Sequence, residues 1–506
     1  MRNSSLSLLG GGFMLITLAQ GCFPCLAEGF AQKTTRKVEG FMLVCPSVAT
    51  VGESFSIRIK ALARPYIVKP GHPQHSTANR SSREAVYMDN VPVSWSGTIC
   101  IQAEGEGFEG PATFSFPKDM RPIARIEGLR FTMPGVKVVT VLDKQSGARG
   151  RGNAIQVHAE KPQLRLYWGD IHNHTIVSDG IRTPEQVCRF ARDEGFLDIF
   201  AITDHDSLPN ERIEKAVQSF YRKGRFVTFF GDELTDGQNG HMNVYYPRKP
   251  NPDKAVRRRD GMGTVAARAR RTNAMLIRHH TAAKLGRTSW PLGYAPDVMR
   301  LIEIYSAWGN SECPKEAGNP RPIRYLGGER SGGHVWDALC RDYRFGFIGS
   351  SDGHDGRPGD DLMYLQTAPR LGGYHKLYKG GLLGVWAEAL TREAIWDALR
   401  NRRVYAATNA RIILRFAING KPMGSEISGS AGKLDLFIEV LSDTAIARVD
   451  LVKQCENVKT WTPNETHLTA RAEDQLTKGK SAWYYVRVSR EDGEMAWSSP
   501  IWVDMP

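Results

Sequence analysis

The stretch YWGDIHNHTIVSDG, residues 167–180, is followed by ITDHD at residues 202–206. His172 and His174 lie two residues apart after a short apolar run, and residues i and i+2 of an extended chain point to the same side. Both imidazoles can therefore bind one ion as neutral nitrogen ligands, of the kind that zinc, manganese or iron accepts. Asp179 follows in the turn SDG and offers an oxygen ligand. The stretch indicates a metal site and favours a metallohydrolase.

A helix and a second strand connect these two motifs. The segment TPEQVCRFARDEG predicts a helix with Thr183 as its N-cap and Gly195 at its end. The apolar run LDIFAIT predicts a strand buried on both faces, which delivers His205 and Asp206 at its carboxyl end. Polar residues that follow each strand in this way are typical of the active sites of parallel α/β sheets and barrels.

The same pattern recurs downstream. Strands are predicted for RFVTFFGDE ending at Glu233, HMNVYY beginning at His241, MLIRHH ending at His279 and His280, RLIEIYS carrying Glu303, and RFGFIGSSDGH running into Asp352 and His354. We expect Glu303 to be a buried partner of a neighbouring basic or metal-binding group. His334 opens the predicted helix HVWDALCRDY, and we expect it to be structural.

The ordered motifs HNH, SDG, TDHD and SDGH resemble those of the PHP (polymerase and histidinol phosphatase) superfamily over roughly residues 161–410. The strings GHMNVYY, IEIYSAWGNSE, FGFIGSSDGH and WAEALTREAIWDALR resemble its DUF3604 branch, which is similar to the CehA/McbA-type metallohydrolases. The resemblance implies an α/β fold built on a distorted seven-fold β/α barrel. It also implies two or three divalent metal ions, with Zn, Mn or Fe as the candidates.

The resemblance further implies how the ligands are shared among the ions. His172, His174, Glu233 and Asp352 would hold the first ion, Glu233 would bridge to a second ion held by His241 and His279, and Asp179, His205 and His354 would hold a third. The family usually has one histidine followed by proline where this chain has His279, His280 and Thr281. Either histidine therefore qualifies as the ligand, and we favour His279.

The predicted reaction is hydrolysis of a phosphate ester by a metal-bridging hydroxide, because coordination lowers the pKa of bound water to about 7. Asp206 is expected to orient His205 by accepting its second ring N–H. Arg278, together with Lys284 and Arg287 on the other side of the histidine pair, is expected to bind a phosphate or carboxylate of the substrate.

Two other functions stay open. The narrower resemblance permits a hydrolase of carboxylic or carbamate esters, and a surface binding protein could use metals to organise a ligand site without turnover. The formal charge of +13 and the pI near 9.3 fit a small-molecule or anionic ester substrate. Some members of the PHP superfamily proofread nucleic acids. We do not expect a nucleic-acid partner for this chain, because that role fits poorly with an export signal and without an attached polymerase.

The first 27 residues predict a secretory signal peptide: Arg2 precedes an apolar run, and small residues surround a cleavage site after Ala27. We therefore expect a periplasmic or secreted protein. Lipid anchoring at Cys22 is the less favoured alternative. No transmembrane segment is expected in the mature chain, since no other apolar stretch approaches the length of about 20 residues that a spanning helix needs.

Short β-prone runs separated by glycine and proline turns flank the predicted barrel on both sides. They predict β-rich, sandwich-like domains at residues 31–160 and 411–506, around a barrel at residues 161–410. Cys45 and Cys100 share the first of these domains, and the sequence leaves open a disulfide between them.

Overall fold

The computed structural model describes residues 37–64, 66–68, 87–92, 94–236, 240–257, 260–286, 290, 293–360, 378–429 and 432–506. The expected signal peptide at residues 1–27 lies outside these residues, as does Arg287. Within the part of the chain that is described, no helix is both long enough and apolar enough to cross a membrane.

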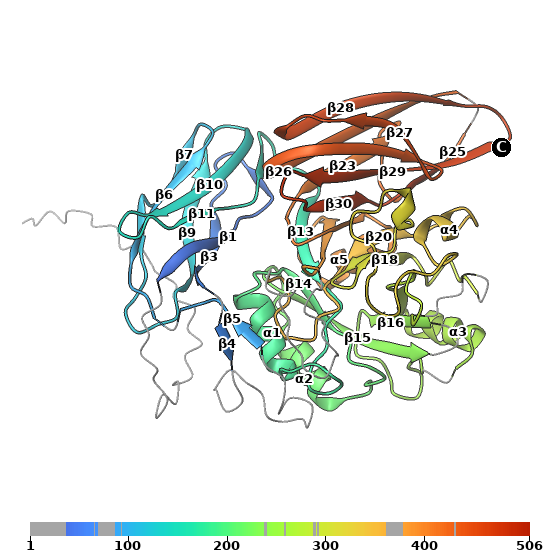
Figure 1. Ribbon diagram of the computed structural model, residues 1–506, viewed down its shortest axis with the longest axis horizontal. Helices are drawn as coiled ribbons and strands as arrows, with labels where there is room; N and C mark the ends of the chain where they lie inside the picture. The colour runs from blue at the N-terminus through green and yellow to red at the C-terminus, as the bar shows by residue number, and fades with distance from the viewer. Residues whose placement is uncertain are drawn as a thin grey trace, which may run out of the picture.

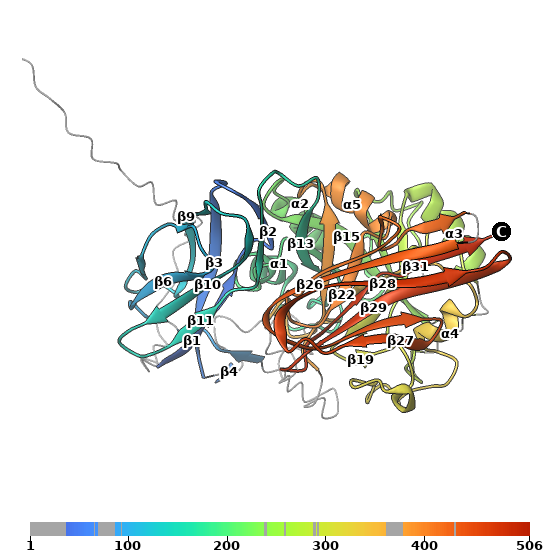
Figure 2. The ribbon, with the colours of Figure 1, turned by 90° about the horizontal axis from the view of Figure 1, so that it is seen from above.

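The N-terminal region is a ten-stranded sheet, drawn in blue to teal in Figures 1 and 2. Its strands are β1 (Val38–Val44), β2 (Val48–Thr50), β3 (Phe55–Ala63), β6 (Thr98–Glu104), β7 (Phe108–Glu109), β8 (Thr113–Ser115), β9 (Ile123–Phe131), β10 (Gly135–Asp143), β11 (Arg149–Arg151) and β12 (Ile155–His158). Two further strands, β4 (Tyr66–Val68) and β5 (Tyr87–Asp89), pair with each other. Alternate residues of β3, among them Ile57 and Ile59, are fully buried in a separate core, as expected for strands with one face turned inward.

The central sheet contains β13 (Arg165–Asp170), β14 (Ile199–Ile202), β15 (Val227–Asp236), β16 (Gly240–Tyr246), β17 (Met275–Arg278), β18 (Leu301–Ser306), β19 (Gly309–Asn310), β20 (Gly346–Gly349), β21 (Leu382–Ala387) and β22 (Val404–Ala407). Strands β13, β14 and β15 are parallel, and so are β17, β18 and β20. Strand β16 is antiparallel to both of its neighbours, and β21 is antiparallel to β13 and β22. Each strand predicted between Tyr167 and His354 is present.

The prediction of a mixed α/β fold is confirmed, and the fold is rich in strands. The pairings of the described strands do not show the seven-fold β/α barrel that the resemblance implied. One reason is the short connection between β15 and β16, where Asp236 pairs with Gly240. So short a loop makes a hairpin, because a parallel crossover needs a dozen or more residues.

The helices are few: α1 (Pro184–Asp193), α2 (Glu211–Phe220), α3 (Met262–Thr272), α4 (Val335–Leu339), α5 (Arg392–Arg400) and the 3-10 turn η3 (Lys315–Ala317). Helix α1 begins where the sequence predicts. The Thr183 hydroxyl accepts a hydrogen bond from the Gln186 N–H, and the Gln186 side chain accepts one from the Thr183 N–H, which is a capping box. The Gly195 N–H then donates to the Phe190 carbonyl and ends the helix.

One face of the central sheet changes from apolar to polar along its strands. Val227 and Phe229 of β15 are buried in the same core as Ile277 of β17. Side chains alternate along a strand, so Glu233 lies on the face of Phe229, and His279 lies on the face of Ile277. The alternation of side chains therefore places Glu233 and His279 close together at one end of the apolar core.

The C-terminal strands continue this sheet. They are β23 (Ile413–Ile418), β24 (Lys421–Pro422), β25 (Glu426–Ser428), β26 (Gly432–Lys453), β27 (Glu456–Trp461), β28 (Glu465–Leu476), β29 (Lys480–Arg490), β30 (Met495–Ser498) and β31 (Ile501–Met505). Strand β22 pairs with β30, which joins the two regions edge to edge. The long strand β26 pairs with β23 and β28 along its first half and with β27 and β29 along its second half. These strands form the orange and red layer along the top of Figure 1.

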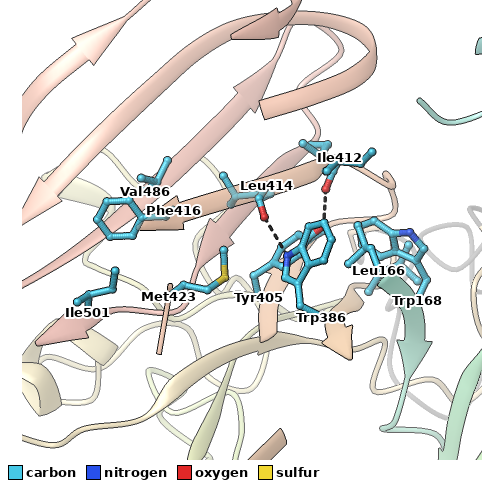
Figure 3. Packing of buried hydrophobic residues seen from close by; sticks show 14 of the residues in the cluster. Leu166, Trp168, Trp386, Tyr405, Ile412, Leu414, Phe416, Met423, Val486 and Ile501 are labelled. Atoms are coloured by element: carbon cyan, nitrogen blue, oxygen red, sulfur yellow. Dashed lines mark hydrogen bonds between the residues drawn. The ribbon is translucent and has the colours of Figure 1, made fainter. Parts of the chain in front are cut away.

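A continuous apolar core fills the space between the central and C-terminal strands (Figure 3). The Trp386 indole N–H donates to the Leu414 carbonyl at 3.2 Å, and the Tyr405 hydroxyl donates to the Ile412 carbonyl at 2.7 Å. Each aromatic ring is thereby buried with its polar atom satisfied. The core crosses the position at residue 411 where the sequence predicted a domain boundary, and the predicted domain limits stay a prediction.

Candidate metal centre

All ten side chains predicted as ligands come together in three groups of four. Within each group, one ligand atom from every residue lies within 4.8 Å of the others. The groups are His172, His174, Glu233 and Asp352; Glu233, His241, His279 and His280; and His174, Asp179, His205 and His354. Glu233 is common to the first two groups and His174 to the first and third. The three groups therefore form one continuous centre.

His172 is held in one orientation by a carboxylate behind it. Its Nδ1 lies 3.0 Å from a Glu303 oxygen, and both side chains are buried. With the Nδ1 proton donated to Glu303, the lone pair is on Nε2, which lies 3.2 Å from Glu233 and 3.3 Å from Asp352. A carboxylate that accepts the second ring N–H is the usual support of a metal-binding histidine. Glu303 is thus a buried partner of a metal-binding histidine, as the sequence predicted.

His174 provides the test of whether an ion fits. Its Nδ1 lies 3.3 Å from the Ser178 hydroxyl. Its Nε2 is buried 3.1 Å from Glu233 and 3.2 Å from Asp352, yet it has no hydrogen-bond partner of acceptable geometry. Burial lowers the pKa of His174, but the neighbouring carboxylates of Asp352 and Glu233 raise it, to about 10. A buried nitrogen between two carboxylates is in surroundings that demand positive charge, and a divalent cation supplies it.

The second group contains both members of the histidine pair. His241 Nδ1 lies 2.7 Å and His279 Nε2 lies 3.1 Å from the same oxygen of Glu233. His280 is in the group as well, although its backbone has a φ of +32°. Burial, followed by the neighbouring histidines, lowers the pKa of His280, which keeps the ring in the neutral form that a metal requires. The structure therefore gathers His279 and His280 at one place and does not separate them as ligands.

The third group forms the open side of the centre. His354 Nε2 lies 3.3 Å and His205 Nε2 lies 3.6 Å from Asp179. The side chains of Asp179 and His205 are 41% and 29% exposed, whereas that of His174 is fully buried. Because the first group is closed to solvent, a molecule from solution reaches the centre on the side of Asp179, His205 and His241.

Asp204 holds the loop beneath His174, a role that sequence reasoning missed. Its carboxylate accepts hydrogen bonds from the Thr175 N–H at 2.6 Å and from the Ser178 hydroxyl at 2.6 Å. Asp204 is fully buried. The available signal was its position directly after a buried strand, where a carboxylate must find donors to compensate for its burial.

The contacts of His205 correct the role predicted for Asp206. The Nδ1 atom of His205 lies 2.6 Å from the Thr235 hydroxyl, so Thr235 orients the ring. Asp206 has an exposed side chain and a φ of +44°, and its N–H donates to the Glu233 carbonyl. Its backbone therefore ties two strand ends together, and the ring of His205 is oriented by another residue.

The substrate contact expected for Arg278 stays a prediction. Arg278 is buried on β17, one residue before His279, and alternation along the strand places it on the face of Leu276, opposite to His279. Lys284 is exposed in the following loop. His334 is outside the three groups: its Nε2 lies 3.3 Å from Glu329, and it caps helix α4, in keeping with a structural role.

Comparison with known proteins supports the resemblance inferred from the motifs. Residues 365–418 match the family described as "Protein of unknown function (DUF3604)", which confirms the predicted resemblance to this family. An uncharacterized protein of Chlamydia trachomatis is 28% identical over 409 residues, covering 75% of this chain and 64% of the relative. An uncharacterized protein of Chlamydia pneumoniae is 28% identical over 366 residues, covering 67% and 57%. The chain thus spans less than two thirds of the length of these relatives.

A solved two-domain protein of Bacteroides vulgatus, described as containing a predicted PHP-like metal-dependent phosphoesterase, is 15% identical to this chain. The match covers 67% of this chain and 97% of that one, with a TM-score of 0.36. At that score the likeness carries no conclusion about the fold or the activity of this chain.

Proposed function

We propose that this chain is a metal-dependent hydrolase of ester bonds, with a small-molecule phosphate ester as its substrate. One observation carries the proposal: ten ligand-type side chains meet in three groups that share Glu233 and His174, buried on one side and open on the other. Seven of the ten are histidines and the other three are carboxylates, a donor set that suits zinc, manganese or iron. Two or three divalent ions fit these groups.

Bound ions would supply Lewis acidity and a water of lowered pKa, which are the two requirements of hydrolysis at neutral pH. The chain's own residues hold the geometry. Glu303 and Ser178 fix the rings of His172 and His174, and Thr235 fixes the ring of His205. The first group lies at buried strand ends, which exclude bulk water from one side of the centre. A substrate would therefore bind at the open side, which the third group forms.

Charge supports a phosphate ester as the substrate. Three of the ligand-type residues are the carboxylates Asp179, Glu233 and Asp352, and an anionic substrate would be repelled by them alone. Two bound divalent ions would outweigh the three negative charges of these ligand-type carboxylates. A pair of ions can also stabilise both the attacking and the leaving oxygen of a phosphoryl transfer.

The test is the release of nitrophenol from phosphate monoesters, phosphate diesters and carboxyl esters by the purified chain, with added manganese or zinc. We expect turnover of a phosphate ester, abolished in His174→Ala. His467→Ala removes an exposed histidine of β28 and serves as the matched control, with full activity expected. Turnover of carboxyl esters alone would favour the carboxylic or carbamate ester hydrolase. Inactivity on every ester, with metals bound, would favour a binding protein without turnover.

We also propose, from the pattern of residues 1–27, that the chain is exported to the periplasm or beyond. The barrel implied by the resemblance is likewise a proposal, which is supported by the parallel strands β13, β14 and β15 and by the parallel strands β17, β18 and β20. Detection of the full-length, uncleaved chain in the cytoplasm of a native host would contradict export.

A further inference from the structure

Two cysteines far apart in the sequence meet at the junction of α4 with the C-terminal strands. The sulfur atoms of Cys340 and Cys455 lie 3.3 Å apart, across a separation of 115 residues. Cys340 is the C-cap of α4, and Cys455 lies in the turn between β26 and β27. The pairing of Cys45 with Cys100 that the sequence left open is not formed, and both of these are free thiols.

Exposure separates this pair from most of the other described cysteines. Cys340 is exposed and Cys455 is half-buried, whereas Cys45, Cys188 and Cys313 are buried. Thiol exchange requires access to the sulfur atom, so a small oxidant reaches Cys340 directly. The two sulfur atoms already lie closer together than two non-bonded sulfur atoms usually do, and a disulfide would need only a small further approach.

Both cysteines are held in place by neighbouring structure. The Cys340 N–H donates to the Trp336 carbonyl at 3.0 Å, and the Trp336 indole N–H donates to the Tyr485 hydroxyl at 2.8 Å. In the hairpin turn, Gln454 and Cys455 have φ values of +46° and +70°, as a two-residue turn requires. Glycine or asparagine is favoured at positive φ in such a turn. Cysteine at position 455 therefore has a backbone conformation that is unfavourable for its side chain.

We propose that Cys340 and Cys455 form a disulfide bond that links α4 to the β26–β27 turn under oxidising conditions. The thiolate of one cysteine attacks a low-molecular-weight disulfide and releases one thiol. The other cysteine then displaces the second thiol from the mixed disulfide. Two protein thiols lose two electrons and two protons, and one small disulfide is reduced to two thiols. The bond closes a loop of more than a hundred residues, which restricts the unfolded chain.

The link also reaches the wall of the metal centre. Helix α4 follows a segment in which the Arg330 N–H donates to the Ala282 carbonyl at 2.7 Å. The Lys284 N–H donates to the Gly328 carbonyl at 3.0 Å in the same region. Ala282 and Lys284 belong to the loop that directly follows His279 and His280. The disulfide therefore ties the C-terminal strands to the segment that supports this loop.

The experiment treats the full chain with oxidised glutathione, alkylates the remaining thiols and maps the peptides without reduction. We expect one cross-linked peptide pair containing Cys340 and Cys455, with a mass lower by two hydrogens than the sum of the thiol peptides. It should disappear in Cys340→Ser and in Cys455→Ser and persist in the matched control Cys100→Ser. Alkylation of both Cys340 and Cys455 after oxidation, or their linkage to other cysteines, would overturn the proposal.

Thermal unfolding provides a second measurement that does not depend on activity, so its outcome is separate from that of the proposed function. The oxidised wild type should unfold a few degrees above its reduced form. In Cys340→Ala and Cys455→Ala, whose reduced forms should unfold as the reduced wild type does, oxidation should leave the transition temperature unchanged. An equal rise in these variants would show that the stabilising bond lies elsewhere.

Discussion

At the scale of single residues, the centre depends on how each histidine ring is held as well as on which atoms face an ion. Glu303, Ser178 and Thr235 each lie within hydrogen-bonding distance of one ring Nδ1 and thereby leave the opposite nitrogen directed inward. Most of the ligand-type residues could be predicted because they stand at the ends of apolar strand runs, and their assignment to particular ions was implied by the resemblance alone. Thr235 and Asp204 were not predictable in their roles, because their contacts form only when separate strand ends meet.

Replacing Glu303 by glutamine tests the support of His172. The amide still fills the space but removes the negative charge that stabilises the Nδ1 proton, so we expect metal affinity to fall about 10- to 100-fold. Competition with a chromogenic chelator measures the affinity. Glu473→Gln changes an exposed carboxylate of β28 and should leave the affinity unaltered. Equal affinities in both variants would contradict the role of Glu303.

Gly180 lies where a side chain has no space. A Cβ atom at this position would lie 2.4 Å from the His174 carbonyl oxygen and 2.8 Å from the Thr175 nitrogen, both of which are backbone atoms. Gly180→Ala should displace the loop that carries His174 and lower stability by about 1 to 3 kcal/mol. Gly263→Ala, in α3 with open space around it, should be neutral or slightly stabilising. Denaturant unfolding of the two variants compares them, and equal stabilities would contradict the close packing.

At the scale of elements, strands and caps were predictable, whereas strand directions were not. The apolar runs of β14, β15 and β17 and the capping residues of α1 are local signals, and local signals can be read from a sequence. Whether a strand joins its neighbour in parallel or antiparallel orientation depends on the connection. The hairpin at Asp236 and Gly240 reverses β16, so the strands of the central sheet are not all parallel.

The N-cap of α1 offers a test of this local encoding. Thr183→Ala removes the acceptor of the Gln186 N–H and should destabilise the chain by about 1 kcal/mol. Thr183→Ser retains the hydroxyl and should restore stability to within a few tenths of a kcal/mol of the wild type. Urea unfolding measures both. A serine variant as unstable as the alanine variant would show that the methyl group, and not the cap, matters.

At the scale of the whole molecule, a buried polar cluster joins the central and C-terminal regions. Glu312 is fully buried; it accepts hydrogen bonds from the Trp497 indole at 2.8 Å and from Arg487 at 2.9 Å, and it is also bonded to the Tyr485 hydroxyl. Together with the β22–β30 ladder, this cluster makes the two regions one sheet and one core. The sequence predicted a domain limit at residue 411 because a series of β-prone runs begins there, whereas the contacts that join the two regions are long-range.

Replacement of Glu312 should therefore lower the unfolding free energy of the central and C-terminal regions together. Glu312→Ala leaves Arg487 with only part of its buried partners, and we expect a loss of about 3 kcal/mol with a single unfolding transition retained. Calorimetry gives both the shift and the number of transitions. Two separate transitions in the wild type would contradict the joint core.

The central claim is that histidines and carboxylates from separate strand ends hold a shared cluster of divalent ions. The most direct test is a crystal structure of the purified chain with anomalous scattering recorded at the zinc, manganese and iron edges. The account predicts two or three ions, each within coordination distance of one of the three groups around Glu233 and His174. A structure grown with these metals in excess, in which no anomalous peak lies near Glu233, would contradict it.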